Sequence, residues 1–299
     1  MIRRISLEES GNHAILLYGP QGAGKSELAS ILAQMWLCTN PTPAGACGEC
    51  RTCSSLDRGT CADLLTIAPS GPSRMIMNRD ITEPSNKKPD DPVPLLDFFR
   101  TPPLRARHKV AILFESDRMN GASCNALLKT LEEPPAFAKM ILTTDSVGSL
   151  PATILSRCLA VACEVPLEKD LLLSFPEATP EEIRFASGAP GRLRTVLDRK
   201  DQYDRLLAFA QKLPTRRASE ALVVSEEFSG ILESFQKVVP GGARAANAEA
   251  IDALALYFAR EPSCPQGWTQ RMIEAHRRIV ANGSAGLVLD AMFTALLTR

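Results

Sequence analysis

The chain contains 299 residues, of which 45% are apolar and 23% charged, a globular composition that excludes a disordered or fibrous protein. Its 34 basic residues balance 34 acidic ones, so any contact with nucleic acid must be local or shared with a partner. No apolar run reaches the roughly 20 residues of a membrane span or the length of a signal sequence, so we expect a cytoplasmic protein. In that compartment its nine cysteines are expected to be thiols or metal ligands. The length predicts about two or three compact units.

The first half of the chain alternates short β-rich runs with helical segments. Strands are predicted at residues 14–18 (AILLY), 110–114 (VAILF) and 140–144 (MILTT), and helices at 26–37 and 123–133. This order predicts an α/β fold, a parallel sheet with helices on both faces. Residues 70–94 are rich in Pro, Ser, Asn and charge and show no period, so we expect an extended surface loop there.

After about residue 165 the pattern becomes helical. Apolar residues repeat at helical spacing in segments such as 203–213 (YDRLLAFAQKL) and 286–297 (GLVLDAMFTALL). We therefore predict three parts, which are an α/β domain at 1–164 with a cysteine module at about 38–53, a small helical lid at 165–203, and an all-α C-terminal domain at 204–299.

A phosphate-binding loop is predicted directly after the first strand. The sequence GPQGAGKS at 19–26 matches G-x-x-x-x-G-K-[ST] between a strand and a helix, the context in which backbone N–H groups surround phosphate oxygens. Lysine supplies a charge and serine a hydroxyl for Mg²⁺, so we predict weak binding of ATP or ADP with Mg²⁺. The residues assigned to the nucleotide are Gly19, Gly22, Gly24, Lys25 and Ser26.

Four cysteines follow the first helix with the spacing C-x8-C-x2-C-x2-C. Cys38, Cys47, Cys50 and Cys53 can close a tetrahedral thiolate shell around Zn²⁺, which leaves no open position and makes the zinc structural. Cys61 lies close enough in sequence to replace one of them, and a set of free or redox-active thiols is the alternative. The four remaining cysteines lie in apolar contexts and are predicted to be packing residues.

The strand at 110–114 ends unusually for an ATPase. P-loop ATPases carry an Asp after this strand to hold the water shell of Mg²⁺, and Phe114 occupies that place here. Glu115 follows as a degenerate second acid. Nucleotide binding and nucleotide hydrolysis are therefore separate questions for this chain.

These features together resemble one protein family. A phosphate loop, a four-cysteine module inserted after its helix, NALLKTLEEPP at 125–135 and LPATILSRC at 150–158 are, in this order, similar to the bacterial DNA polymerase III clamp-loader ATPases of the AAA+ class. The resemblance covers about 14–158, and the second half resembles the family's helical collar only loosely.

Three departures distinguish the family's motor subunits, gamma or tau, from its delta prime subunit. Phe114 replaces the magnesium-positioning Asp, and Gly191 stands where motors carry a lid arginine, with Arg192 one position later. A chain of 299 residues also has no room for the long extension of tau. The resemblance therefore implies the delta prime type.

The resemblance also implies a function. A delta prime subunit helps to load the sliding clamp onto primed DNA, in a ring with gamma or tau and delta subunits and as part of the DNA polymerase III holoenzyme, with weak or absent ATPase activity of its own. Arg157, in the sequence SRC, matches a finger that acts in trans on a neighbouring subunit's ATP, and we expect it at the carboxyl edge of the sheet. Thr143 and Thr144 match the position that senses phosphate; buried strand residues are the alternative.

Other interpretations stay open at this point. An active motor subunit would need Glu115 or Asp117 to take over the metal, and a zinc-bearing P-loop kinase would leave SRC unexplained. The basic run at 100–109 is typical of a solvated turn, although it could touch DNA phosphates. Neither the subunit stoichiometry nor the residues that touch DNA follow from the sequence.

Overall fold

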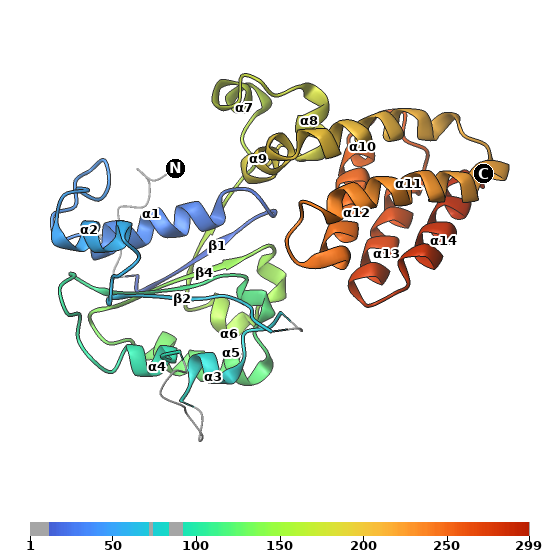
Figure 1. Ribbon diagram of the computed structural model, residues 1–299. Coiled ribbons are helices and arrows are strands. Elements are labelled where there is room, and N and C mark those ends of the chain that lie inside the picture. Colours follow the sequence, from blue (N-terminus) through green and yellow to red (C-terminus); the bar gives the residue numbers. More distant parts are fainter. Residues whose placement is uncertain (1–11, 72–73, 84–91, 299) are drawn as a thin grey trace. The chain divides into compact units, whose positions relative to one another are not determined.

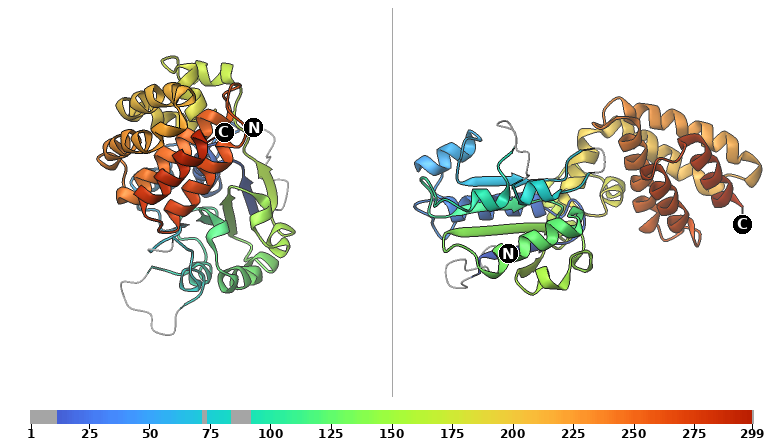
Figure 2. Two further views of the ribbon diagram at one scale, coloured as in Figure 1. Left: turned by 90° about the vertical axis from the view of Figure 1, so that its right-hand side faces the viewer. Right: turned by 90° about the horizontal axis from the view of Figure 1, so that it is seen from below.

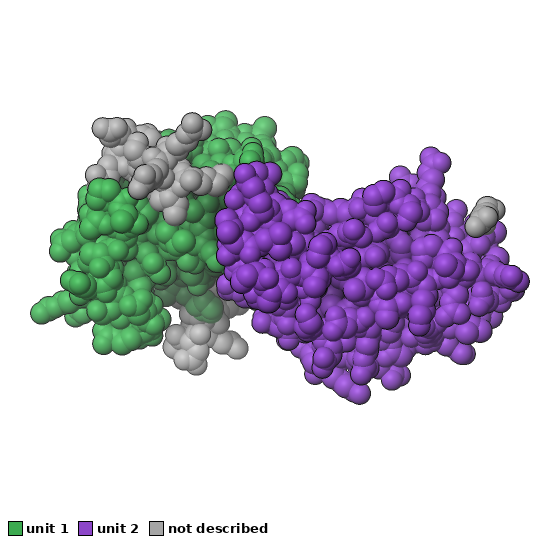
Figure 3. All heavy atoms as spheres, turned by 90° about the horizontal axis from the view of Figure 1, so that it is seen from above, with its two compact units in different colours: residues 1–164 green, residues 165–299 purple. Residues whose placement is uncertain are grey.

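The computed structural model describes residues 12–71, 74–83 and 92–298 (Figure 1). The chain divides into two compact units, Met1–Glu164 and Val165–Arg299, drawn in green and purple in Figure 3. Each unit has a hydrophobic core of its own.

The first unit is built on a five-stranded sheet in the order β2-β3-β4-β1-β5, in which every neighbouring pair is parallel. The strands are β1 (Ala14–Tyr18), β2 (Leu64–Ile67), β3 (Lys109–Leu113), β4 (Ala138–Thr144) and β5 (Leu159–Ala162). The helices are α1 (Lys25–Leu37), α2 (Arg51–Asp57), α3 (Asn78–Ile81), α4 (Leu95–Phe98), α5 (Gly121–Glu132) and α6 (Ala152–Leu155), with 3-10 turns at Ser116–Arg118 and Val147–Ser149. The predicted α/β fold class is confirmed.

Helices cover both faces of this sheet, which a parallel sheet requires because both of its faces are apolar. On one face α1 lies across β1, β3 and β4, and its Leu32 and Trp36 pack against Ile15 and Ile112. The opposite face carries α3 to α6 (Figures 1 and 2). Because β1, β3 and β4 are parallel, their carboxyl ends meet at one edge of the sheet, where ligands of α/β proteins usually bind.

The prediction of an extended surface loop at residues 70–94 is wrong in part. Ile76 and Ile81 are fully buried, Ile76 forms a parallel bridge with Met119, and α3 packs against α5. Two buried isoleucines without a regular period, together with hydrogen bonds from Ile76 N–H to Arg118 and from Ser123 Oγ to the Ile76 carbonyl, fix this segment to the core. Residues 72–73 and 84–91 of the predicted loop lie outside the described residues.

The second unit is helical, as predicted. Its helices are α7 (Glu168–Ser174), α8 (Pro180–Phe185), α9 (Pro190–Asp198), α10 (Lys200–Lys212), α11 (Ala221–Gln236), α12 (Gly242–Ala259), α13 (Trp268–Val280) and α14 (Ala285–Leu297), with 3-10 turns at Leu213–Thr215 and Ala218–Glu220. One cluster of buried side chains runs from Leu171 to Leu297, so the division into lid and collar stays a prediction. Among the residues described, none of the helices combines the length and apolar character needed to cross a membrane.

Candidate functional site

The phosphate loop connects β1 to α1 and depends on its glycines. Gly22 and Gly24 have φ values of 81° and 86°, a left-handed conformation that other residues rarely adopt. At Gly19 a Cβ atom would lie 2.2 Å from the carbonyl oxygen of Cys163, so no side chain fits there. The loop ends at Lys25, the first residue of α1, and the exposed Ser26 follows in the first turn of the helix.

Lys25 is bound within the loop and to one acid outside it. Its Nζ donates to the carbonyl oxygens of Gly19 at 2.7 Å and Pro20 at 2.9 Å, and forms an ion pair with Asp145 Oδ1 at 2.8 Å. The Lys25 side chain is 10% exposed and that of Asp145 is 62% exposed. A phosphate group would therefore compete with the Asp145 carboxylate for the ammonium. Asp145 was not predicted; its position directly after the central strand β4 is the signal that could have found it.

The edge of the site after β3 carries an aromatic ring in place of a carboxylate. Phe114 is half-buried and packs against the core beneath α1. Glu115 has a φ of 48°, and its carboxylate pairs with Arg74 at 2.8 Å and, more weakly, with Arg118 at 3.9 Å. The charge of Glu115 is thus offset by two guanidinium groups, and its catalytic role stays a prediction.

Both threonines at the end of β4 are buried and use their hydroxyl groups within the protein. Thr143 Oγ1 accepts the backbone N–H of Glu115 at 3.0 Å. Thr144 Oγ1 lies 3.2 Å from Asp117 Oδ1 and 3.0 Å from the carbonyl oxygen of Ser146. Asp117 is therefore tied to Thr144, and a phosphate-sensing role for Thr144 stays a prediction.

Arg157 lies at the amino edge of the sheet, so the expectation that it follows the carboxyl edge is wrong. β5 runs parallel to β1 with Leu159 opposite Ile15, which places Arg157 beside the beginning of β1. The phosphate loop follows the end of β1, and five strand residues separate the two edges by about 16 Å at ~3.3 Å per residue. The loop and Arg157 of one chain are therefore not parts of one site.

The guanidinium of Arg157 is held by several partners near the ends of α5 and α6. Its NH1 donates to the carbonyl oxygen of Thr153 at 2.8 Å and to Ser156 Oγ at 3.2 Å, while NH2 pairs with Glu132 Oε1 at 2.7 Å. The side chain is 33% exposed. Burial raises the pKa of the neighbouring Cys158 thiol to about 11, so this cysteine packs as a neutral group.

Arg192, the residue after Gly191 in the predicted lid, is held by an acid of α12. Gly191 and Arg192 lie in the first turn of α9, and Arg192 NH1 pairs with Asp252 Oδ2 of α12 at 2.9 Å. Its guanidinium is thus used for an ion pair inside the second unit.

The four predicted zinc ligands come together between α1 and α2. The sulfur atoms of Cys38, Cys47, Cys50 and Cys53 all lie within 4.8 Å of one another. Neighbouring sulfurs are 3.4 to 4.0 Å apart, whereas a tetrahedral shell with Zn–S distances of about 2.3 Å places them about 3.8 Å apart. Cys61 lies outside this group and packs against the α1 side of the core. The donor set therefore fits one structural Zn²⁺.

Backbone N–H groups prepare the sulfur atoms for a cation. Those of Cys47, Cys50 and Cys53 each point at the sulfur of the preceding cysteine in the cluster, at 3.3 to 3.4 Å. Hydrogen bonds from Glu49 and Cys50 lower the pKa of the Cys47 thiol. Desolvation opposes ionisation of Cys50, but hydrogen bonds from Thr39 and the Cys53 backbone outweigh it and lower its pKa to about 5. The thiolate, the form that binds zinc, is thus favoured at Cys47 and Cys50, whereas burial raises the pKa of the Cys53 thiol.

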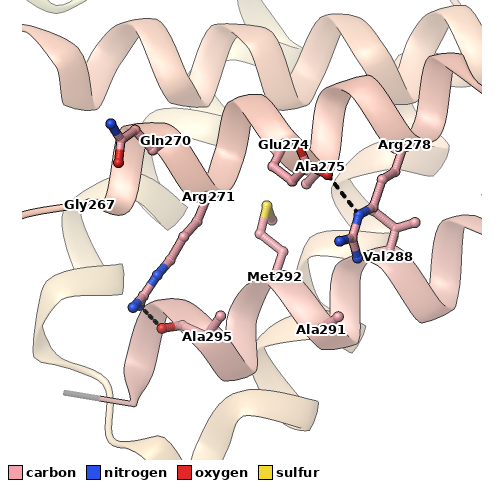
Figure 4. A pocket seen from close by; sticks show the side chains of 10 residues that line it. All are labelled: Gly267, Gln270, Arg271, Glu274, Ala275, Arg278, Val288, Ala291, Met292 and Ala295. Carbon is pink, nitrogen blue, oxygen red and sulfur yellow. Dashed lines mark hydrogen bonds and ion pairs between the residues drawn. The ribbon is translucent and has the colours of Figure 1, made fainter.

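A shallow groove between α13 and α14 in the second unit carries two arginines (Figure 4). Arg271 donates to the carbonyl oxygen of Ala295 and so caps the end of α14. Arg278 pairs with Glu274, one turn earlier in α13, at 3.1 Å. Both charges are used within these two helices, so the groove adds no site.

Comparison with known proteins points to one family. Residues 1–166 match the family model described as DNA polymerase III, delta subunit. The chain is 32% identical over 200 residues to DNA polymerase III subunit tau/gamma of Haemophilus influenzae, and 36% identical over 170 residues to DNA polymerase III subunit delta' of Pseudomonas aeruginosa. These regions cover 64% and 57% of this chain but 27% and 48% of the relatives, so the match spans less than half of either relative.

A solved structure shares the fold over the whole chain. The crystal structure of a DNA polymerase III gamma subunit-related protein from Thermotoga maritima aligns with 100% of this chain and 98% of its own, with a TM-score of 0.56 and 22% identity. The predicted α/β architecture, a parallel sheet with helices on both faces followed by a helical region, is confirmed.

Proposed function

The chain belongs to the DNA polymerase III delta-subunit family, and on that basis we propose that it is a delta prime subunit of a clamp loader, which helps to place the sliding clamp on primed DNA during replication. Its partners are gamma or tau and delta subunits in a hetero-oligomeric ring in the cytoplasm. Its zinc is structural, and its phosphate loop binds ATP or ADP with Mg²⁺ weakly or keeps only a structural role.

The observation that carries this proposal is the separation of Arg157 from its own phosphate loop. The two lie at opposite edges of the sheet, about 16 Å apart along β1 at ~3.3 Å per residue. A fixed guanidinium at an edge remote from the chain's own nucleotide is suited to a neighbour's ATP, because its charge and donors match the oxygens of a phosphoryl transition state. Arg157 thus acts as an arginine finger in trans.

The altered metal edge supports a weak ATPase. Phe114 cannot hold a hydrated cation, and the Glu115 carboxylate is paired with Arg74. Lys25 is paired with Asp145, which a phosphate group must displace. Each of these features weakens hydrolysis by this chain without affecting a finger that serves another subunit.

A second candidate is a catalytic motor subunit of the gamma or tau type. The phosphate loop keeps its lysine and serine, and the tau/gamma and delta' relatives match the chain at similar identity, 32% and 36%. Asp117 beside Thr144 is the acid that would have to take over the metal in that case.

One experiment separates the two candidates. The purified chain is mixed with gamma or tau and delta subunits, the composition of the complex is measured by native mass spectrometry, and steady-state ATP hydrolysis is measured for the isolated chain. We expect one copy in the complex and no turnover at a motor's rate. Motor-like turnover by the isolated chain that disappears in Lys25→Ala would show that it is a motor subunit.

A further inference from the structure

Glu132 makes the contact that fixes the outer end of Arg157. It is the last residue of α5, its side chain is 50% exposed, and its Oε1 lies 2.7 Å from Arg157 NH2. The other partners of the guanidinium, Thr153 and Ser156, are close in sequence and bind NH1. Glu132 is thus the one described partner that comes from a different part of the chain.

The backbone on both sides of this contact is held by buried residues. Leu131 is 1% exposed and Ile154 0%, and both pack in the core on the face opposite α1. Pro134 and Pro135 follow α5 and restrict the chain after Glu133. The carboxylate and the guanidinium therefore project from two fixed supports, which limits the movement of the guanidinium plane.

The place of Glu132 is unfavourable for helix stability. The carboxyl end of a helix carries a partial negative charge, so an acidic side chain in the last turn is repelled and destabilises the helix slightly. A half-exposed ion pair stabilises the fold by a similarly small amount, so the net contribution of Glu132 to the free energy of folding is small. Its contact with Arg157 accounts for a carboxylate at this position better than stability does.

We propose that Glu132 is a positioning residue for the Arg157 finger, an inference that rests on the proposed function of Arg157 in trans. A guanidinium has five N–H donors in a fixed plane. Thr153 and Ser156 accept hydrogen bonds from NH1, and Glu132 accepts one from NH2. The Nε–H group and the second N–H group of NH2 have no partner among the described residues. Glu132 thus holds one side of the plane and leaves other donors for phosphate oxygens.

The test uses the assembled clamp loader with variants of this subunit. Glu132→Ala should leave assembly unchanged and lower kcat for DNA- and clamp-stimulated ATP hydrolysis by up to about fivefold, as expected for the loss of one half-exposed ion pair. KM for ATP should change little. Glu132→Gln, which keeps an acceptor oxygen, should recover part of the rate. The matched control Glu133→Ala removes the adjacent exposed carboxylate and should have no effect.

A double-mutant comparison separates this inference from the proposed function. If Glu132 acts through the finger, adding Glu132→Ala to Arg157→Ala lowers kcat no further. An unchanged or raised rate in Glu132→Ala, while Arg157→Ala is impaired, overturns the positioning role alone. An additive loss overturns it as well, and so does a defect in Glu132→Ala and Glu132→Gln that appears as failed assembly. An unchanged rate in Arg157→Ala overturns the finger itself.

Discussion

The affinity of a phosphate-loop lysine for nucleotide depends on the groups within the protein that compete for its ammonium. In this chain the Lys25 ammonium has two carbonyl oxygens and the Asp145 carboxylate around it, all within 2.9 Å. The Asp145 carboxylate forms an ion pair with the ammonium, and its negative charge repels a phosphate group that approaches the loop. Since Asp145 is 62% exposed, water screens this repulsion and its effect on nucleotide affinity is modest.

Replacing Asp145 should therefore strengthen nucleotide binding. We expect Asp145→Asn to lower the Kd for MgADP by about fivefold, since two charges about 4 Å apart in water interact with about 1 kcal/mol. Isothermal titration calorimetry on the isolated chain measures this, with Glu133→Gln as a control that removes one exposed negative charge elsewhere. An unchanged Kd in Asp145→Asn, or an equal change in the control, would contradict the role given to Asp145.

At the scale of elements, the cysteine module joins α1 to α2 and thereby supports the first unit. Cys38 follows α1, Cys50 caps α2 by accepting the N–H of Cys53, and Leu56 of α2 packs against the core beneath α1. A metal that binds all four sulfurs closes this segment. Its binding energy then contributes directly to folding of the unit.

Zinc removal should accordingly destabilise the first unit. Elemental analysis should find about one zinc per chain, and chelation or Cys50→Ser should lower the Tm of this unit by several degrees. Cys61→Ser is the matched control, because Cys61 lies outside the sulfur cluster, and it should keep both the zinc and the Tm. Absence of zinc from protein purified without chelator would show that the cluster is a set of free thiols.

Elements with a local signal were predictable from the sequence, and those fixed by distant partners were not. β1, β3, β4, α1 and α5 have apolar periodicity and, for α1, a motif. The edge strands β2 and β5 were missed because they are only four residues long and their assignment depends on pairing with β3 and β1.

Contacts of the candidate site that join residues distant in sequence were likewise not predictable. Residue types and spacing identified the glycines and the four cysteines, because each set belongs to a motif, whereas Arg157 was assigned from the family resemblance alone. Lys25 and Asp145 are 120 positions apart, and Arg74 and Glu115 are 41 apart, so no local pattern connects them. The edge of the sheet on which Arg157 lies followed only from the register of β5 on β1.

At the scale of the whole molecule, each unit is stabilised by its own core and the two differ in kind. The first unit carries the phosphate loop, the cysteine cluster and Arg157. The second is a helical body in which ion pairs tie α9 to α12, through Arg192 and Asp252 at 2.9 Å, and α8 to the turn after α12, through Arg184 and Glu261 at 2.7 Å. Every residue assigned to ATP chemistry belongs to the first unit, and under the proposed function Arg157 meets the nucleotide of a neighbouring subunit.

The measurement that tests this account most directly is ATP hydrolysis by a clamp loader assembled with the Arg157→Ala subunit. The variant should fold, keep its zinc and join the complex, yet lower DNA- and clamp-stimulated hydrolysis in part, because one of several interfaces is altered. Arginine fingers in other P-loop systems contribute roughly 10³ to 10⁵ in rate at their own site. Arg157→Lys should not restore the rate, since an ammonium lacks the planar fork. A complex with Arg157→Ala that hydrolyses ATP and loads clamps at the unmodified rate would contradict the account.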